Sequence, residues 1–328
     1  MSPAGRAGSM LIRFWGTRGS LPAPLGTAGL RRKLVRAVRQ AAGRSFPSDE
    51  AIEQFVARDL DFATSHTFGG NTACVQIDVG GPEYVLCDLG SGARELGLAA
   101  MAARKPGVAQ VFHVFLSHLH WDHIQGFPFF VPSYVPGTRI VIHGCHEDIE
   151  AGFRRQHGAP SFPVDFSQLP SRIEFDRMVP GQTYEIAGLR VTGRQQFHSG
   201  DSYAYRFERD GKTVVYSTDS EHKLDDPTIA RAFADFFRDA DLVIFDAMYS
   251  LADAFSIKED WGHSSNIVGV ELCQMAGVRH LCLFHHEPAY DDEKLTAIWR
   301  ESQRLEELTR GERPLRITAA YDGLELRV

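Results

Sequence analysis

The chain has 328 residues, enough for one large hydrophobic core or two modest ones. Its composition, 43% hydrophobic and 23% charged, is that of a globular protein, and no apolar stretch reaches the roughly 18 residues that indicate a membrane-spanning helix. The net charge of −7 argues against a protein whose main task is to bind a long polyanion. Residues 1–9 are small and polar and lack the apolar centre of a secretory signal, so we expect a flexible leader and a cytoplasmic protein.

The first half of the chain alternates short apolar strands with glycine-rich turns. We predict strands over residues 11–15, 72–78, 84–88, 111–116 and 139–143, and a helix from 93 to 101. Residues 21–66 differ, because they carry two amphipathic helical patterns, over 30–40 and 49–62. This segment is therefore predicted to be a helical insertion between strands.

The second half combines hairpin-like strands with buried strands and helices. Strands are predicted over residues 184–187, 189–197, 202–208, 212–217, 242–246, 278–284, 315–320 and 324–328, and helices over 226–238, 265–275 and 291–309. Residues 157–182 are expected to be loop-rich, and the sequence shows no internal repeat and no linker. We therefore expect residues 1–328 to form a single domain of the α/β class with mixed sheets.

The sequence Ser-His-Leu-His-Trp-Asp-His at residues 117–123 directly follows a buried strand. His118 and His120 are alternate residues of an extended segment, so their rings lie on one side, whereas Asp122 and His123 follow where the chain turns. Burying four such side chains without partners would cost several kcal/mol. Imidazole and carboxylate are ligands for cations of borderline hardness such as zinc, manganese or iron, so the motif predicts ligands for two adjacent metal ions.

Further ligand-type side chains stand at the ends of other apolar strands. They are His198, Asp219 and the pair His285 and His286. Functional side chains gather where the strands of an α/β sheet end, so we expect these residues to complete the metal site. These two histidines are adjacent, and the sequence alone leaves both His285 and His286 as candidates.

This series of motifs resembles the metallo-β-lactamase superfamily of binuclear hydrolases, over nearly the whole chain. The resemblance implies an αββα sandwich of two mixed β-sheets flanked by helices. It also implies a ligand set: one cation at His118, His120 and His198, the other at Asp122, His123 and His285, and Asp219 between them. Two divalent ions are implied, zinc in preference to manganese or iron.

Three stretches are similar to the branch that contains ribonuclease Z and cyclic-nucleotide phosphodiesterases. They are residues 14–20 together with 69–72, the Asp-Leu-Gly-Ser-Gly turn at 88–92, and Trp-Gly-His-Ser-Ser at 261–265. The resemblance makes His263 a candidate to assist proton transfer. For Asp88 we expect a carboxylate that orients a ligand histidine or a loop.

Other polar residues of these loops are weaker candidates. Arg18, Asn71 and Ser199 could donate hydrogen bonds to a phosphate, although exposed turn residues often do so without function. Trp121, inside the histidine motif, is predicted to serve packing.

The resemblance implies a metal-dependent phosphodiesterase that hydrolyses cyclic nucleotides or a related small phosphodiester by means of a hydroxide between the two cations. Asp219 would orient the nucleophile and His263 would protonate the leaving oxygen. The alternatives are an RNA 3′-processing nuclease of the ribonuclease Z type, a lactone, thioester or β-lactam hydrolase, and a non-catalytic nucleotide-binding protein. Nucleic acid is disfavoured as a substrate by the charge of −7.

The insertion at residues 21–66 enters beside loops expected at the mouth of the site. It is interpreted as a lid or a dimer contact, with a solvated basic face on its first helix. A homodimer is the oligomer that the resemblance implies, and no membrane partner is expected.

Overall fold

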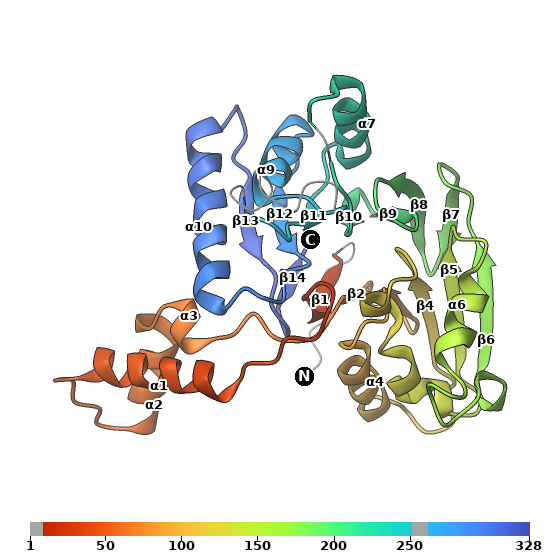
Figure 1. Cartoon of the computed structure of the whole chain (residues 1–328), viewed down its shortest axis with the longest axis horizontal. Coiled ribbons are helices and arrows are strands. Elements are labelled where there is room, and N and C mark those ends of the chain that lie inside the picture. Colours follow the sequence, from red (N-terminus) through yellow and green to blue (C-terminus); the bar gives the residue numbers. More distant parts are fainter. Residues whose placement is uncertain (1–8, 223, 251–261) are drawn as a thin grey trace.

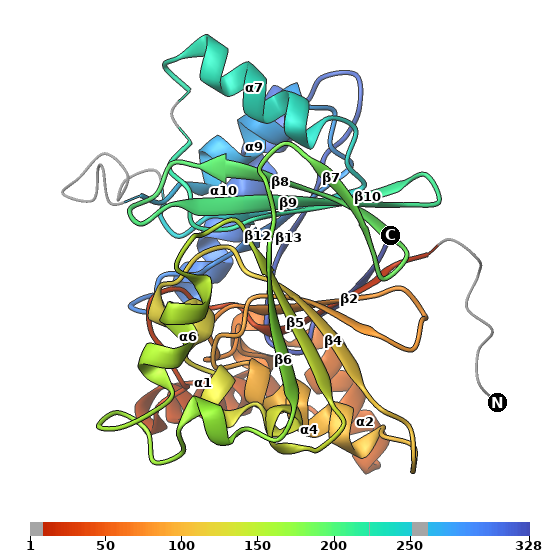
Figure 2. The ribbon, with the colours of Figure 1, turned by 90° about the vertical axis from the view of Figure 1, so that its right-hand side faces the viewer.

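The computed structural model describes residues 9–222, 224–250 and 262–328, and it consists of two seven-stranded sheets packed face to face. Helices cover the outer face of each sheet, so the chain forms four layers (Figures 1 and 2). The predicted αββα sandwich is confirmed. The predicted leader at residues 1–9 lies almost wholly outside the described residues.

The first sheet contains the strands of the N-terminal half and the last strand of the chain. Its order is β14 (Glu325–Arg327), β1 (Leu11–Gly16), β2 (Cys74–Asp78), β3 (Tyr84–Cys87), β4 (Val111–Phe115), β5 (Arg139–Gly144) and β6 (Arg172–Arg177). Strands β3 to β6 are parallel to one another. Helices α4 (Ala93–Ala102) and α6 (Ile149–Gln156) pack their buried side chains, such as Leu96 and Phe153, with the outer face of this sheet.

The second sheet has the order β13 (Arg316–Ala319), β12 (His280–Phe284), β11 (Leu242–Asp246), β10 (Lys212–Ser217), β9 (Ser202–Arg209), β8 (Leu189–Gln196) and β7 (Thr183–Ile186). Strands β10 to β13 are parallel. Helices α7 (Pro227–Phe237), α9 (Asn266–Met275) and α10 (Asp292–Thr309) cover its outer face (Figure 2).

The main core lies between the two sheets. Side chains from both inner faces, among them Phe14, Phe115, Tyr205 and Phe284, are buried there. The parallel strands are apolar because they are covered on both faces. The candidate site lies at the carboxyl ends of strands of both sheets, where polar side chains follow the apolar runs.

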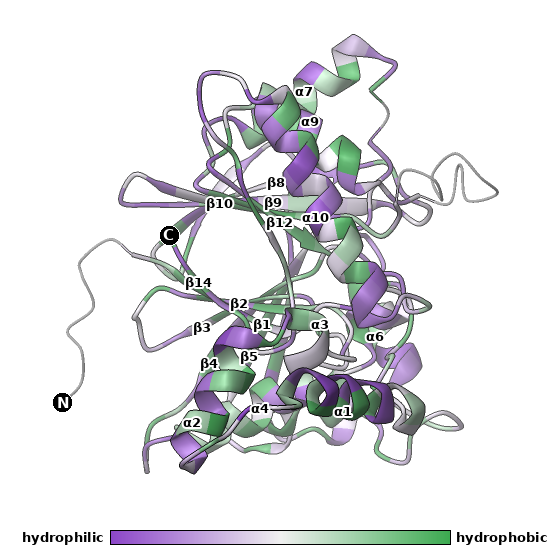
Figure 3. Cartoon of the chain, turned by 90° about the vertical axis from the view of Figure 1, so that its left-hand side faces the viewer, coloured by the Kyte–Doolittle hydropathy of each residue, from purple (hydrophilic) through white to green (hydrophobic). Residues whose placement is uncertain are grey.

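The insertion is helical, but its second helix is broken. It contains α1 (Thr27–Ala41), α2 (Asp49–Gln54), a π-helical turn (Phe55–Asp59) and α3 (Phe62–Ser65). The predicted helix over 49–62 ends at Leu60, whose backbone is extended, and the Asp61 side chain then caps α3. Hydrophilic and hydrophobic residues alternate along α1 (Figure 3), and no residue of α1 is fully buried.

One segment was predicted wrongly. Within the loop-rich region expected at 157–182, residues Arg172–Arg177 form β6, the edge strand of the first sheet. Short helices lie at Trp121–Ile124 (α5), Phe127–Phe129, Val131–Tyr134 and Phe166–Gln168. Among the described residues, no helix has the length and apolar character needed to cross a membrane.

Candidate metal centre

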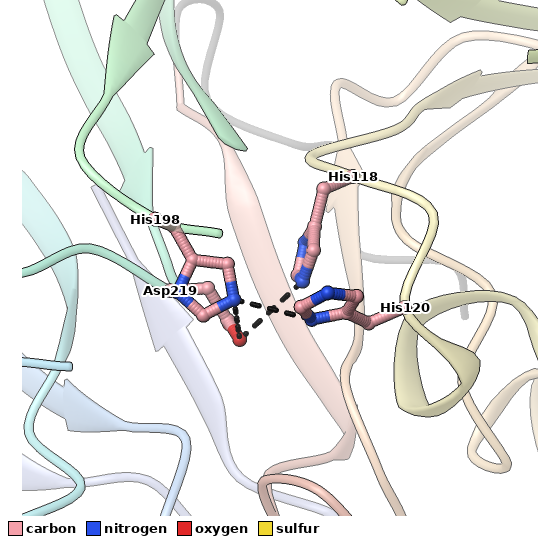
Figure 4. Close-up of side chains that lie close together, drawn as sticks. All are labelled: His118, His120, His198 and Asp219. Carbon is pink, nitrogen blue, oxygen red and sulfur yellow. Dashed lines mark hydrogen bonds and ion pairs between the residues drawn. The ribbon is translucent and has the colours of Figure 1, made fainter. Parts of the chain in front are cut away.

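The predicted ligands meet at the carboxyl ends of four strands. The histidine motif follows β4, His198 follows β8, Asp219 follows β10 and His285 follows β12. Their side chains converge from both sheets into one site, of which Figure 4 shows four members. Segments more than 160 residues apart in the sequence thus contribute to a single cluster, as the sequence analysis expected.

One group consists of His118, His120, His198 and Asp219. One potential ligand atom from each of the four lies within 4.8 Å of the others. His198 Nε2 lies 3.1 Å from His120 Nδ1, and Asp219 Oδ2 lies 3.6 Å from His118 Nε2 (Figure 4). His118 and Asp219 are buried, whereas His120 is exposed, so this group opens to solvent on the His120 side.

The second group consists of Asp122, His123, Asp219 and His285, all of which are buried. Asp219 Oδ1 lies 3.1 Å from His123 Nε2 and 3.2 Å from His285 Nε2. The two oxygens of Asp219 therefore face different groups. His286 points elsewhere and donates from Nε2 to the Ala320 carbonyl at 2.8 Å, which leaves His285 as the member of the cluster.

Tight backbone turns direct three of the carboxylate and imidazole side chains. Asp88, Asp219 and His285 have positive φ angles of 60°, 44° and 58°; Asp88 and His285 directly follow a strand, and Asp219 lies two residues after one. This left-handed conformation is unfavourable for residues with a side chain and is typical of functional sites. It lets the chain turn at the strand end while the side chain points into the cluster.

Buried acceptors fix the orientation of the imidazole rings. Asp88 accepts from His123 Nδ1 at 2.7 Å, and also from the Ser117 amide and the Tyr216 hydroxyl. The carbonyl of Gly262 accepts from His198 Nδ1 at 2.7 Å. Because Nδ1 carries the hydrogen in both neutral rings, Nε2 of each ring presents a lone pair to the cluster. Asp88 has the orienting role expected for it.

These residues fit a metal. His123 Nε2 lies 3.2 Å from an oxygen of Asp122 and 3.1 Å from one of Asp219, so a positive charge, either a proton on this nitrogen or a bound cation, has to lie between these atoms. His118 Nε2 is buried without a hydrogen-bond partner among the described residues. Such an arrangement is unfavourable unless a cation lies among the acceptors, and nitrogen and carboxylate oxygen are ligands of zinc and similar ions.

The charge of the cluster favours a cation as well. Burial opposes the charged form, yet the carboxylates of Asp219 and Asp122 raise the pKa of His123 well above its usual value. At His118 burial dominates, with the neighbouring His123 adding to it, and its pKa is lowered well below the usual value. The carboxylates thus attract positive charge, while His118 stays a neutral ligand.

His263 forms a third group with Asp246 and His285. Its Nδ1 donates to Asp246 Oδ2 at 2.9 Å and lies 4.0 Å from Asp219 Oδ2. Burial lowers the pKa of His263, but the Asp246 carboxylate outweighs this effect and raises it to about 9. Asp246 was missed in the sequence, although its position at the end of the apolar strand β11 is the signal shared by the predicted ligands.

The three weaker candidates have different surroundings. Arg18 is buried and donates to the carbonyls of Gly69, Glu287 and Tyr290. Asn71 accepts from Ser91 through its side chain. These contacts give both residues a structural role in the loop. Ser199, in contrast, is exposed, and together with His198 it lines a surface cavity.

The interpretation of Trp121 as a packing residue is wrong. Its side chain is 76% exposed, although its neighbours in the motif are metal-ligand candidates. Trp121 begins the short helix α5 and lies on its solvent side, whereas the next two residues, Asp122 and His123, are buried. Trp261, the first residue of the Trp-Gly-His-Ser-Ser element, lies outside the described residues.

Comparison with known families gives a match over the centre of the chain. Residues 83–286 match the β-lactamase superfamily domain. Ribonuclease Z of Methanosarcina acetivorans is 25% identical over 313 residues, which cover 79% of this chain and 92% of the relative. Ribonuclease Z of Brevibacillus brevis is 31% identical over 266 residues, covering 64% of this chain and 78% of the relative.

Solved structures share the fold over almost their full length. The metallo-β-lactamase fold protein YhfI from Bacillus subtilis superposes with a TM-score of 0.63 at 18% identity, covering 98% of this chain and all of that chain. Yeast PDE1 gives a TM-score of 0.64 at 13% identity with the same coverage. The short form of human tRNase Z gives 0.58 at 16% identity, covering 96% of this chain and 98% of that one.

Proposed function

The chain belongs to the metallo-β-lactamase superfamily, in its ribonuclease Z-like branch, and from this premise we propose that it is a binuclear metal-dependent phosphodiesterase. The observation that carries the proposal is the position of Asp219, whose two oxygens face two separate groups of imidazole and carboxylate ligands. His118, His120 and His198 would hold one cation, and Asp122, His123 and His285 the other. Zinc suits this donor set best.

Divalent cations bound here would supply an activated water and would neutralise the charge of the phosphate oxygens. Asp219, between the two groups, is placed to orient the nucleophile and to accept its proton. His263 holds a hydrogen bond to Asp246 through Nδ1, so its Nε2 can donate a proton to the leaving oxygen. Asp88 and the Gly262 carbonyl keep the ligand rings in the required tautomers.

A 3′,5′-cyclic nucleotide or a related small phosphodiester is the substrate class that we favour, in a cytoplasmic enzyme that acts as a homodimer. The net charge of −7 supports a small substrate over RNA. The relatives named ribonuclease Z support the second candidate, RNA 3′-end processing. The insertion over residues 21–66 is proposed to act as a lid or to contribute to the dimer.

The test is a chromatographic turnover assay on zinc- or manganese-loaded protein. The substrates are cyclic mononucleotides, cyclic dinucleotides and a 3′-extended transfer RNA, and Asp219→Ala is the control. We expect a cyclic nucleotide to be converted to its linear monophosphate by the wild type and not by the variant. Cleavage of the RNA alone would establish the second candidate instead, and turnover by Asp219→Ala would refute the role of Asp219.

A further inference from the structure

A cavity of about 610 Å³ adjoins the metal centre, and His198 forms part of its wall. The loop between β8 and β9 supplies Phe197 and Ser199 to this cavity. Glu221 follows β10, and Ile229 belongs to α7. Its wall therefore includes a candidate metal ligand. A substituent of a phosphate bound at the metal centre enters this cavity if it extends past His198.

Phe197 presents an exposed ring to solvent beside this site. Its side chain is 53% exposed, although the residue directly precedes His198. Phe233 of α7 supports the ring edge to face, with centroids 6.1 Å apart, and the guanidinium of Arg194 lies over Phe233 at 4.5 Å. The Phe197 carbonyl also accepts from the Glu221 amide at 2.8 Å, which ties this residue to the loop of Asp219. The exposed ring is thus held in place relative to the catalytic carboxylate.

The charge of the cavity limits what can occupy it. Asp201 and Glu221 contribute carboxylates, and the described residues that line it include no lysine or arginine. The amide group of Gln195 donates to Asp201 Oδ1 at 2.9 Å, which leaves its carbonyl oxygen as an acceptor. The Asp201 carboxylate and the Gln195 carbonyl oxygen therefore suit a flat group that carries N–H donors.

We propose that this cavity binds the nucleobase of the substrate, with the base stacked on Phe197. The inference rests on the proposed phosphodiesterase function and deepens it, because it names a nucleoside phosphodiester as the substrate and Phe197 as a specificity-determining residue. An exposed aromatic ring stacks on any base, and carboxylate and amide oxygens accept from base N–H groups. The cavity shares His198 with the metal centre, so a base attached to a phosphate held there can extend into it.

Two chromogenic substrates with the same leaving group provide the test. Thymidine 5′-(p-nitrophenyl phosphate) carries a nucleoside and methyl p-nitrophenyl phosphate does not, so the ratio of their kcat/KM values measures recognition of the nucleoside. In the metal-loaded wild type we expect the thymidine ester to be preferred. In Phe197→Leu, which keeps an apolar side chain, this preference should fall by about 5- to 100-fold, mostly through a higher KM, and Phe197→Tyr should retain it.

Phe129→Leu is the matched control. Phe129 is 57% exposed, but it lines a different cavity, next to Trp121. The preference for the thymidine ester should survive this substitution. An unchanged preference in Phe197→Leu, or an equal loss in both variants, would overturn the assignment of the base site. Failure of the wild type to hydrolyse either ester would instead refute the proposed function, and the base site with it.

Discussion

At the scale of single residues, buried carboxylates outside the ligand set control the imidazoles of the site. Asp88 fixes His123, and Asp246 fixes His263 while it also accepts from the amides of Ser220 and Met248. The residues that form the cluster and the role of Asp88 could be predicted from the sequence, because strand ends and local motifs indicate them. Asp246 could not, since one acidic residue after a strand is equally typical of an ordinary turn.

Asp246→Asn should lower kcat by about 10- to 100-fold, because the amide cannot hold His263 as the carboxylate does. The effect is measured in steady-state turnover of the metal-loaded protein. His263→Ala should give a loss of similar size, and the double variant should lose little more, since both changes remove one function. Losses that multiply in the double variant would show that the two residues act independently.

At the scale of elements, the insertion is attached to the core by a largely buried ion pair. Lys33 of α1 lies 2.6 Å from Asp292 at the start of α10, and the two side chains are 14% and 6% exposed. Lys33 also donates to the carbonyl of His66, and Asp292 accepts from the amide of Phe68. These contacts fix the insertion from α1 to the loop after α3.

Lys33→Met should therefore loosen the insertion, because it leaves the carboxylate of Asp292 buried without its partner, at a cost of about 3 kcal/mol. Limited proteolysis should cut the variant within residues 27–65 faster than the wild type. Arg36→Met is the control, since its pair with Glu293 is exposed and is worth at most about 1 kcal/mol. Equal protection of Lys33→Met and wild type would contradict the anchoring role.

Element boundaries show where sequence reasoning reached its limit. The long helix predicted at 291–309 was found at Asp292–Thr309, because an acidic cap and a sustained apolar period mark it. The strand β6 was missed, although Arg172–Arg177 alternates polar and apolar residues. It lies at the edge of its sheet, pairs only with β5, and is flanked by prolines at 170 and 180 that are typical of loops. The break at Leu60 interrupts a run whose apolar period is typical of one continuous helix.

At the scale of the whole molecule, histidines away from the site are buried as neutral groups and make the fold sensitive to acid. Burial, with a smaller effect of Arg316 on the adjacent strand, lowers the pKa of His280 to about 4. Its usual value is near 6.5, so the unfolded chain binds this proton first as the pH falls. The contribution of His280 to stability is present above about pH 6.5 and is lost as the pH falls towards 4.

The metal-free protein should accordingly be less stable at pH 5 than at pH 8, with His280 accounting for about 1 to 2 kcal/mol of the difference. Urea unfolding of the chelator-treated protein at both pH values measures this difference without the effect of metal release. His280→Gln should narrow the difference by that amount. A variant with the same pH dependence as the wild type would show that His280 does not titrate on unfolding.

The central claim, that two bound ions form one catalytic unit around Asp219, is tested most directly by metal titration. Protein freed of metal by a chelator is titrated with zinc while hydrolysis of bis(p-nitrophenyl) phosphate and bound zinc are measured together. We predict no hydrolysis without metal, a plateau at two zinc ions per chain, and no hydrolysis by Asp219→Ala at any zinc concentration. Full activity in the metal-free protein, or a plateau at a single ion per chain, would contradict the claim.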